Sequence, residues 1–160
     1  MSESQQATET DNEMAAPDLR RRPPRSPRVR LGGYVLLPRM LDKGRATVAE
    51  QNGEYHYDCP MDQHFINFTG IDAGQLKEEL AAGKGDSDIL EWIQANAQRS
   101  REPWEIGQWA VHLEARVPGD TETREYFNEL HKAASELGEG IATWFDLLDL
   151  DDYVTFGGKA

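Results

Sequence analysis

The chain has 160 residues, among them 29 acidic and 17 basic side chains and a single cysteine, and its net charge is −12. A body this acidic repels phosphate backbones, which disfavours direct nucleic-acid binding by the domain, and one cysteine excludes an internal disulfide. No apolar run approaches the roughly 20 residues of a membrane span, and the N-terminus lacks the apolar core of a signal peptide. We therefore expect a cytoplasmic protein with no membrane partner.

Charge is divided unevenly along the chain. Residues 1–19 carry five acidic and no basic side chains, residues 20–30 carry six arginines and no acid, and the other 130 residues carry 11 basic and 24 acidic side chains. We predict a disordered tail over residues 1–22, acidic and then arginine-rich, followed by one globular helical domain over residues 23–160. The arginines of residues 20–30 either bind an anionic partner or dock on the acidic domain, and the charge balance favours docking.

Hydrophobic spacing and capping signals predict helices through most of the domain. Met40, Leu41 and Val48 form the inner stripe of the first, which leaves its charged residues outside that stripe. We predict helices over residues 38–49, 60–70, 72–83, 86–98, 103–117, 120–137 and 144–151. Residues 54–58 and 153–156 have the pattern of short extended segments that could pair. The expected fold class is all-α: a compact single-domain bundle of six to seven short helices, with at most a minimal two-strand ribbon of 54–58 and 153–156.

Several helix ends are marked by particular residues. Asp72, with Gln75 three positions later, and Thr143, with Asp146 three positions later, both resemble capping boxes. Gly70 is expected to end its helix in a left-handed conformation. Asp86 or Ser87 is expected to cap the helix that follows it.

The richest stretch chemically is Gly53–Ile71, which reads GEYHYDCPMDQHFINFTGI. Pro60 keeps Cys59 out of helical geometry and is suited to open a helix, so Cys59 should lie at a junction between extended chain and helix. Asp62 should fall in the first helical turn, and Phe65 should face the core.

Candidate chemical roles follow from these residue types. The candidate catalytic residues are His56, Asp58, Cys59, Asp62 and His64, because a thiol at a helix N-terminus beside an imidazole is a possible nucleophile, and the carboxylates could transfer protons. His56, Cys59 and His64 are also the candidate ligands for zinc or iron. Their spacing matches no common metal motif, so no cofactor is predicted, and the metal site is kept as an alternative.

The candidate binding residues are Arg39, Arg45, Tyr55 and Tyr57. The tyrosines lie within the stretch, and an arginine of the preceding helix either completes a small pocket with them or forms an ion pair that fixes the junction. We thus expect a binding or interaction protein with a groove beside residues 54–64 and an unknown protein or small-molecule partner. The alternative is a small enzyme or metal-binding protein that uses His56, Cys59, Asp62 and His64.

The C-terminal residues 144–150 alternate aromatic and leucine side chains with acids. They are consistent with a peptide that docks on a partner, but a terminal helix that packs its own apolar face is the simpler interpretation.

Four stretches also resemble a known family: PPRSPRVRLGGYVLLPRMLDKGRA, GEYHYDCPMDQHFINFTGID, REYFNEL and TWFDLLDLDDYVTFGGKA. They are similar to a bacterial family termed domain of unknown function 5069, and the resemblance covers about residues 23–160. It implies one compact domain in the bacterial cytoplasm and places residues 23–30 with the domain. The family has no established activity, so no catalytic residue is transferred from it.

Overall fold

The computed structural model describes residues 15–135 and 140–158, and this part of the chain contains seven helices and no β-sheet. The prediction of an all-α fold is confirmed. An isolated bridge joins Leu31 and Tyr34. The helices are α2 (Leu37–Val48), α3 (Asp62–Thr69), α4 (Ala73–Ala81), α5 (Asp86–Asn96), α6 (Pro103–Glu114), α7 (Thr121–Ala134) and α8 (Trp144–Thr155).

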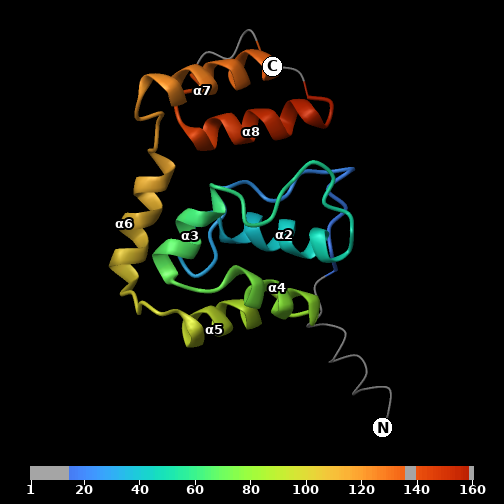
Figure 1. The fold of residues 1–160 in the computed structure, drawn as a ribbon, viewed down its shortest axis with the longest axis vertical. Coiled ribbons are helices and arrows are strands. Elements are labelled where there is room, and N and C mark those ends of the chain that lie inside the picture. The colour runs from blue at the N-terminus through green and yellow to red at the C-terminus, as the bar shows by residue number, and fades with distance from the viewer. Residues whose placement is uncertain (1–14, 136–139, 159–160) are drawn as a thin grey trace.

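The helices surround α2, which lies in the middle of the molecule (Figure 1). Helices α4 and α5 lie on one side of it, the pair α7 and α8 lies on the other, and α6 runs along the flank between the two pairs. The segment between α2 and α3 passes next to α2 on the side that faces α8. This segment holds most of the residues that the sequence singled out.

The central position of α2 explains why the predicted pattern of buried and exposed residues on this helix is wrong. We predicted an inner apolar stripe with the charged residues outside it, yet every residue from Leu37 to Ala46 is buried. Arg39, Asp42, Lys43 and Arg45 are therefore buried as well, and each forms an ion pair with a residue of opposite charge. Burial of a charge is tolerated when the charge is paired and hydrogen-bonded, so neighbouring helices can enclose α2 completely.

Two apolar clusters form the core. The larger packs α2, α3, α4 and α5 around Phe65, whose ring meets Tyr34 edge-to-face at 5.2 Å between centroids. The smaller joins the residues before α2 to α6 and α8 through Leu36, Leu113 and Phe145. Helix α4 and the loop come close to α2 at Gly44, where an added Cβ would lie 2.5 Å from Leu80 Cδ1.

Most capping predictions are confirmed. Asp72 accepts a hydrogen bond from Gln75 N at the start of α4, and Thr143 and Asp146 form a reciprocal capping box at α8. Gly70 ends α3 with φ of 72°. The cap predicted at Asp86 or Ser87 is wrong, because the N-cap of α5 is Gly85. The carboxylate of Asp86 instead binds two arginines and is not available to the helix end. The end predicted for α7, near residue 137, lies outside the described residues.

The predicted ribbon of 54–58 with 153–156 is wrong. Turns at residues 53–54 and 57–58 interrupt the first segment, and α8 continues through Thr155. The two segments are nevertheless joined through side chains: Tyr55 Oη donates to Asp152 Oδ1 over 2.8 Å. A helix that presents Asp152 to this tyrosine satisfies its own backbone groups, so no strand pairing is needed.

The N-terminal segment packs along the domain. Our tail prediction is wrong for residues 15–22, since Leu19 is buried and its N–H donates to Gln51 O over 2.9 Å. One leucine in an acidic stretch is a weak signal, and Gly53 lies close to its backbone, where an added Cβ would come within 3.1 Å of Leu19 O. The remaining part of the predicted tail, residues 1–14, lies outside the described residues.

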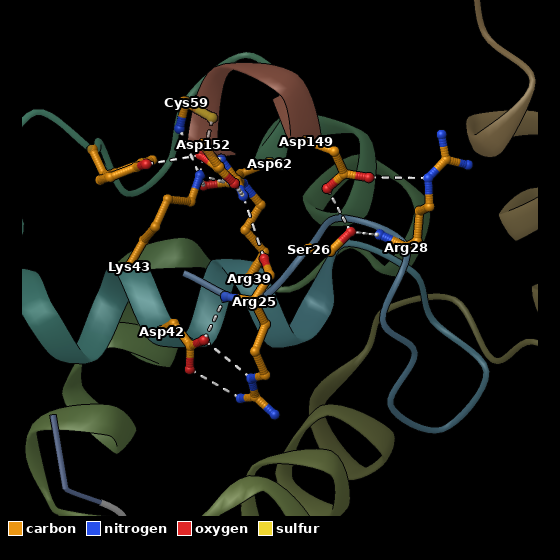
Figure 2. A network of polar contacts seen from close by, with 11 residues as sticks. Arg25, Ser26, Arg28, Arg39, Asp42, Lys43, Cys59, Asp62, Asp149 and Asp152 are labelled. Atoms are coloured by element: carbon orange, nitrogen blue, oxygen red, sulfur yellow. Dashed lines mark hydrogen bonds and ion pairs between the residues drawn. The ribbon is translucent and has the colours of Figure 1, made fainter. Parts of the chain in front are cut away.

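Three of the arginines dock on the domain, as the charge balance favoured. Arg25 pairs with Asp42 and Asp86, Arg28 with Asp146 and Asp149, and Arg30 with Glu114. Figure 2 shows two of these contacts, Arg25 with Asp42 on α2 and Arg28 with Asp149 on α8. The segment therefore ties α2, α5, α6 and α8 together through charge.

This docking predicts a dependence of stability on pH. Burial alone would raise the pKa of Asp86, but hydrogen bonds and charge from Arg25 and Arg45 outweigh it and hold the pKa below 3.8. A carboxyl with a lowered pKa stabilises the fold above its unfolded pKa and loses that contribution as the pH falls through its folded pKa. Asp86→Asn should lower the free energy of unfolding by about 1.5–3 kcal/mol at neutral pH.

Urea unfolding followed by circular dichroism between about pH 6 and pH 2 checks this expectation. The difference between wild type and Asp86→Asn should shrink as the pH falls below about 4. A difference that stays constant over this range would contradict the role given to Asp86.

Candidate functional site

The loop between α2 and α3 positions the central residues. Asp58 adopts a φ of 60°, in the left-handed region that Asp tolerates better than most residues, and this turns the chain toward α3. The helix begins at Asp62, two residues later than Pro60 suggested, and Gln63 N donates to Cys59 O across the junction. Cys59 therefore lies just before α3, as predicted, and it is half-buried.

A buried ion pair lies beneath Cys59. Lys43 Nζ donates to both carboxylate oxygens of Asp62 over 2.9 Å and lies 3.3 Å from Cys59 Sγ (Figure 2). The side chains of Lys43 and Asp62 are 5% and 1% exposed. Because both charges are almost completely removed from water, each depends on the other, and the pair fixes the junction against α2.

A second buried pair joins α2 to α8. Arg39 Nη1 donates to Asp152 Oδ2 over 2.7 Å, and its guanidinium lies 5.6 Å from the centre of the Tyr55 ring. Burial and the hydrogen bond to Asp152 raise the pKa of the Tyr55 phenol well above its usual value. Tyr55 therefore stays neutral and serves as a hydrogen-bond donor, and the loop is held to α8 as well as to α2.

Two hollows flank the segment from Cys59 to Met61. The first, of about 640 Å³, lies between the loop, α2 and the C-terminal half of α8. The residues that line it include Arg39, Lys43, Tyr55, His56, Cys59, Met61, Asp62, Leu148 and Asp151. Arg39, Lys43 and Asp62 of the two buried ion pairs line it, so these charged groups already have partners.

The second hollow, of about 600 Å³, lies between the start of α3, α7 and α8. Its wall is mainly apolar and includes Pro60, Met61, Tyr126, Leu130, Trp144, Leu147 and Leu148. His64 and Arg116 also line it, and their side chains meet at 2.6 Å between Nε2 and Nη1. Arginine only donates, so the imidazole accepts this hydrogen bond.

The charge state of His64 agrees with that arrangement. Burial, the positive charge of Arg116 and the nearby His112 lower the pKa of His64 below 6.5. The ring is thus neutral near pH 7, and Arg116 carries the only positive charge of this pair. The two hollows share Cys59, Met61, Leu148 and Asp151, so they adjoin along one line of contact between the loop and α8.

The structure unites some of the predicted site residues and separates others. Cys59 and Asp62 meet at Lys43, and His56 lines the same hollow, whereas His64 lines the other one. Asp58 lines neither hollow and accepts a hydrogen bond from Gln63 at the surface. In residues 15–135 and 140–158, no three His, Cys, Asp or Glu side chains form a group suited to a metal ion. The catalytic and metal roles of these residues stay predictions.

The predicted binding residues are divided in the same way. Arg39 and Tyr55 line the first hollow. Arg45 lies away from both hollows and binds Asp86, and Tyr57 donates its hydroxyl to Ala73 O over 2.6 Å. Burial, with the nearby Asp62 carboxylate, raises the pKa of Tyr57. Arg45 and Tyr57 thus contact other parts of the domain, and their binding roles stay predictions.

Sequence reasoning missed several residues that complete these hollows. Lys43 was placed outside the inner stripe of its helix, and Trp144 was treated only as part of a terminal helix. Arg116 lies 52 positions from its partner His64. The one local feature that could have singled out Arg116 is its position just after the C-terminus of a helix. Many solvated arginines occupy such a position, so the feature does not indicate a site.

Comparison with known proteins identifies the family. The model of the family described as "Domain of unknown function (DUF5069)" matches residues 21–154. The chain belongs to this family. The DUF5069 match spans the docked arginines, the second hollow, most of the first hollow and nearly all of α8. No curated protein matches the chain significantly. Within the described part of this DUF5069 chain, no helix is both long enough and apolar enough to cross a membrane.

Proposed function

We propose that the protein acts in the cytoplasm by binding a small molecule in the paired hollows beside residues 54–64. The observation that carries this proposal is the pair of adjoining hollows of about 640 and 600 Å³ that share Cys59 and Met61. Both volumes lie in the range of roughly 300–1,000 Å³ that is typical of ligand sites. The stretch expected to border a groove thus borders both hollows.

The surroundings favour binding by a preformed site. The loop is held to α2 through Lys43 and Asp62, and to α8 through Tyr55 and Asp152. A ligand that enters therefore needs little reordering of the protein, which reduces the entropic cost of binding. Concave walls favour a small molecule over a flat protein partner.

Nucleic acid is the less suitable partner. Arg25, Arg28 and Arg30 are already engaged by carboxylates of the domain, and the rest of the chain is strongly acidic. The alternative of an enzyme or metal-binding protein gains no specific support, because His56 and His64 line different hollows.

Nile red, a neutral apolar dye, tests the proposal with the full chain. We expect the folded protein to bind the dye with one-to-one stoichiometry and increased fluorescence. Because Cys59 is the only cysteine and lines both hollows, alkylation with N-phenylmaleimide places an aromatic group at the site. Alkylated protein should bind the dye at least about tenfold more weakly.

Two controls make the result specific. Cys59→Ser protein treated with the same reagent should keep its affinity. Gly119 lines the second hollow and Gly107 lies on α6, and an added Cβ meets no atom within 4 Å at either position. Gly119→Trp should weaken dye binding, whereas Gly107→Trp should not. If wild type does not bind Nile red, or if all these proteins bind it equally well, the proposal is overturned.

A further inference from the structure

The second hollow combines an apolar wall with one cation that lacks an acidic partner. Among the described residues, no carboxylate lies within the 4.0 Å ion-pair distance of the Arg116 guanidinium, although eleven ion pairs engage other arginines. Of the Arg116 nitrogens, only Nη1 forms the hydrogen bond with His64. Arginine has five N–H donors in a planar fork, so most of them remain free for a ligand.

The acids that line this hollow are otherwise engaged or distant. Asp120 accepts hydrogen bonds from the backbone and hydroxyl of Thr123 at the N-terminus of α7. Asp151 lies at the end of the hollow that adjoins the first one, since it lines both. Neither is close enough to Arg116 to neutralise it, so an anionic group of a ligand is the complementary partner.

The opposite wall offers exposed apolar surface. Tyr126 is 56% and Leu130 is 39% exposed, both on α7. The Tyr126 ring lies 6.4 Å from the Trp144 ring of α8, so the two form an aromatic surface that spans the helix pair. An aromatic or aliphatic body that covers these side chains would remove their apolar area from water.

From these contacts we infer that the second hollow binds a compact amphipathic monocarboxylate, with the carboxylate on Arg116 and the apolar body against Tyr126, Leu130 and Trp144. A planar carboxylate matches the guanidinium fork and can accept two parallel hydrogen bonds. His64 acts as a positioning residue, because its acceptor nitrogen holds the guanidinium at the rim of the hollow. The inference rests on the proposed function and specifies its ligand class.

Diphenylacetate and diphenylacetamide provide a matched test, since they share an apolar body and differ in the charge of the polar group. Isothermal titration calorimetry with the full chain should show the acid binding at least about tenfold more tightly than the amide. Arg116→Gln should reduce the affinity for the acid to that for the amide and leave the amide unchanged. Arg124→Gln is the matched control, because Arg124 is an exposed arginine of α7 that lies over Phe127 and outside the hollow.

Equal affinities of wild type for acid and amide, or an acid preference that survives in Arg116→Gln, would overturn the inference. So would the absence of acid binding by a protein that binds Nile red. In these cases the proposed function stands as long as the dye still binds and Gly119→Trp still weakens it. Loss of the acid preference in Arg124→Gln to the same extent as in Arg116→Gln would also overturn it, because a general charge effect would then explain the result.

Discussion

Asp62→Ala should lower the free energy of unfolding by about 3–5 kcal/mol. Removal of the carboxylate leaves the Lys43 ammonium buried with its side chain 5% exposed and without its ion-pair partner. The remaining contact, Cys59 Sγ at 3.3 Å, is a weak acceptor and cannot replace two charged hydrogen bonds. Urea unfolding at neutral pH, followed by circular dichroism, measures the loss.

A double variant separates the cost of a lone charge from the value of the pair. Lys43→Met combined with Asp62→Leu removes both charges and keeps apolar volume, so it should be less destabilised than Asp62→Ala alone. Glu54→Ala removes an exposed acid of the same loop and should change stability by less than about 0.5 kcal/mol. A loss below about 1 kcal/mol in Asp62→Ala would contradict the importance given to this pair.

Phe65→Ala should lower the free energy of unfolding by about 3–5 kcal/mol as well, through a different mechanism. Phe65 is fully buried, and its ring meets Tyr34 edge-on at 5.2 Å and Trp109 at 6.3 Å between centroids. The truncation removes these contacts and leaves a cavity between α2, α3 and α6 that the helices can fill only in part. Chemical denaturation gives the size of the effect.

Trp104→Ala is the matched control for Phe65→Ala, since Trp104 is a larger aromatic residue that is 65% exposed. It should change stability by less than about 0.5 kcal/mol. Near-ultraviolet circular dichroism adds a second measurement, because loss of Phe65 should weaken the signal of the packed Tyr34 and Trp109 rings. A loss below about 1 kcal/mol for Phe65→Ala would mean that its helix face is assigned wrongly.

Helix positions were predictable because their signals are local. Thr143 with Asp146, and Asp72 with Gln75, mark helix starts within four residues, and Gly70 marks an end by itself. The ribbon was mispredicted for a related reason. Short alternating segments also occur in turns and at the ends of helices, and pairing between residues 54–58 and 153–156 depends on contacts that are distant in sequence.

The stretch that borders the hollows was predictable, and the residues that complete the hollows were not. The stretch that gathers the only cysteine with histidines and tyrosines indicated where the hollows lie, because polar and aromatic side chains beside a helix start often border a concave surface. Its functional partners come from elsewhere: Lys43 from α2, Asp152 from α8 and Arg116 from beyond α6. One sequence contains no signal for such pairings.

By itself, the sequence determined the all-α fold class, the helix ends set by caps and glycines, and the stretch that borders the hollows, and it favoured the docking of an arginine-rich segment on an acidic body. These properties depend on near neighbours along the chain or on total charge. Only the tertiary structure decided that α2 is buried on every side, that its charges are paired, and that Arg116 meets His64. Those features depend on which distant side chains share the same small volume, and that is settled when the helices pack.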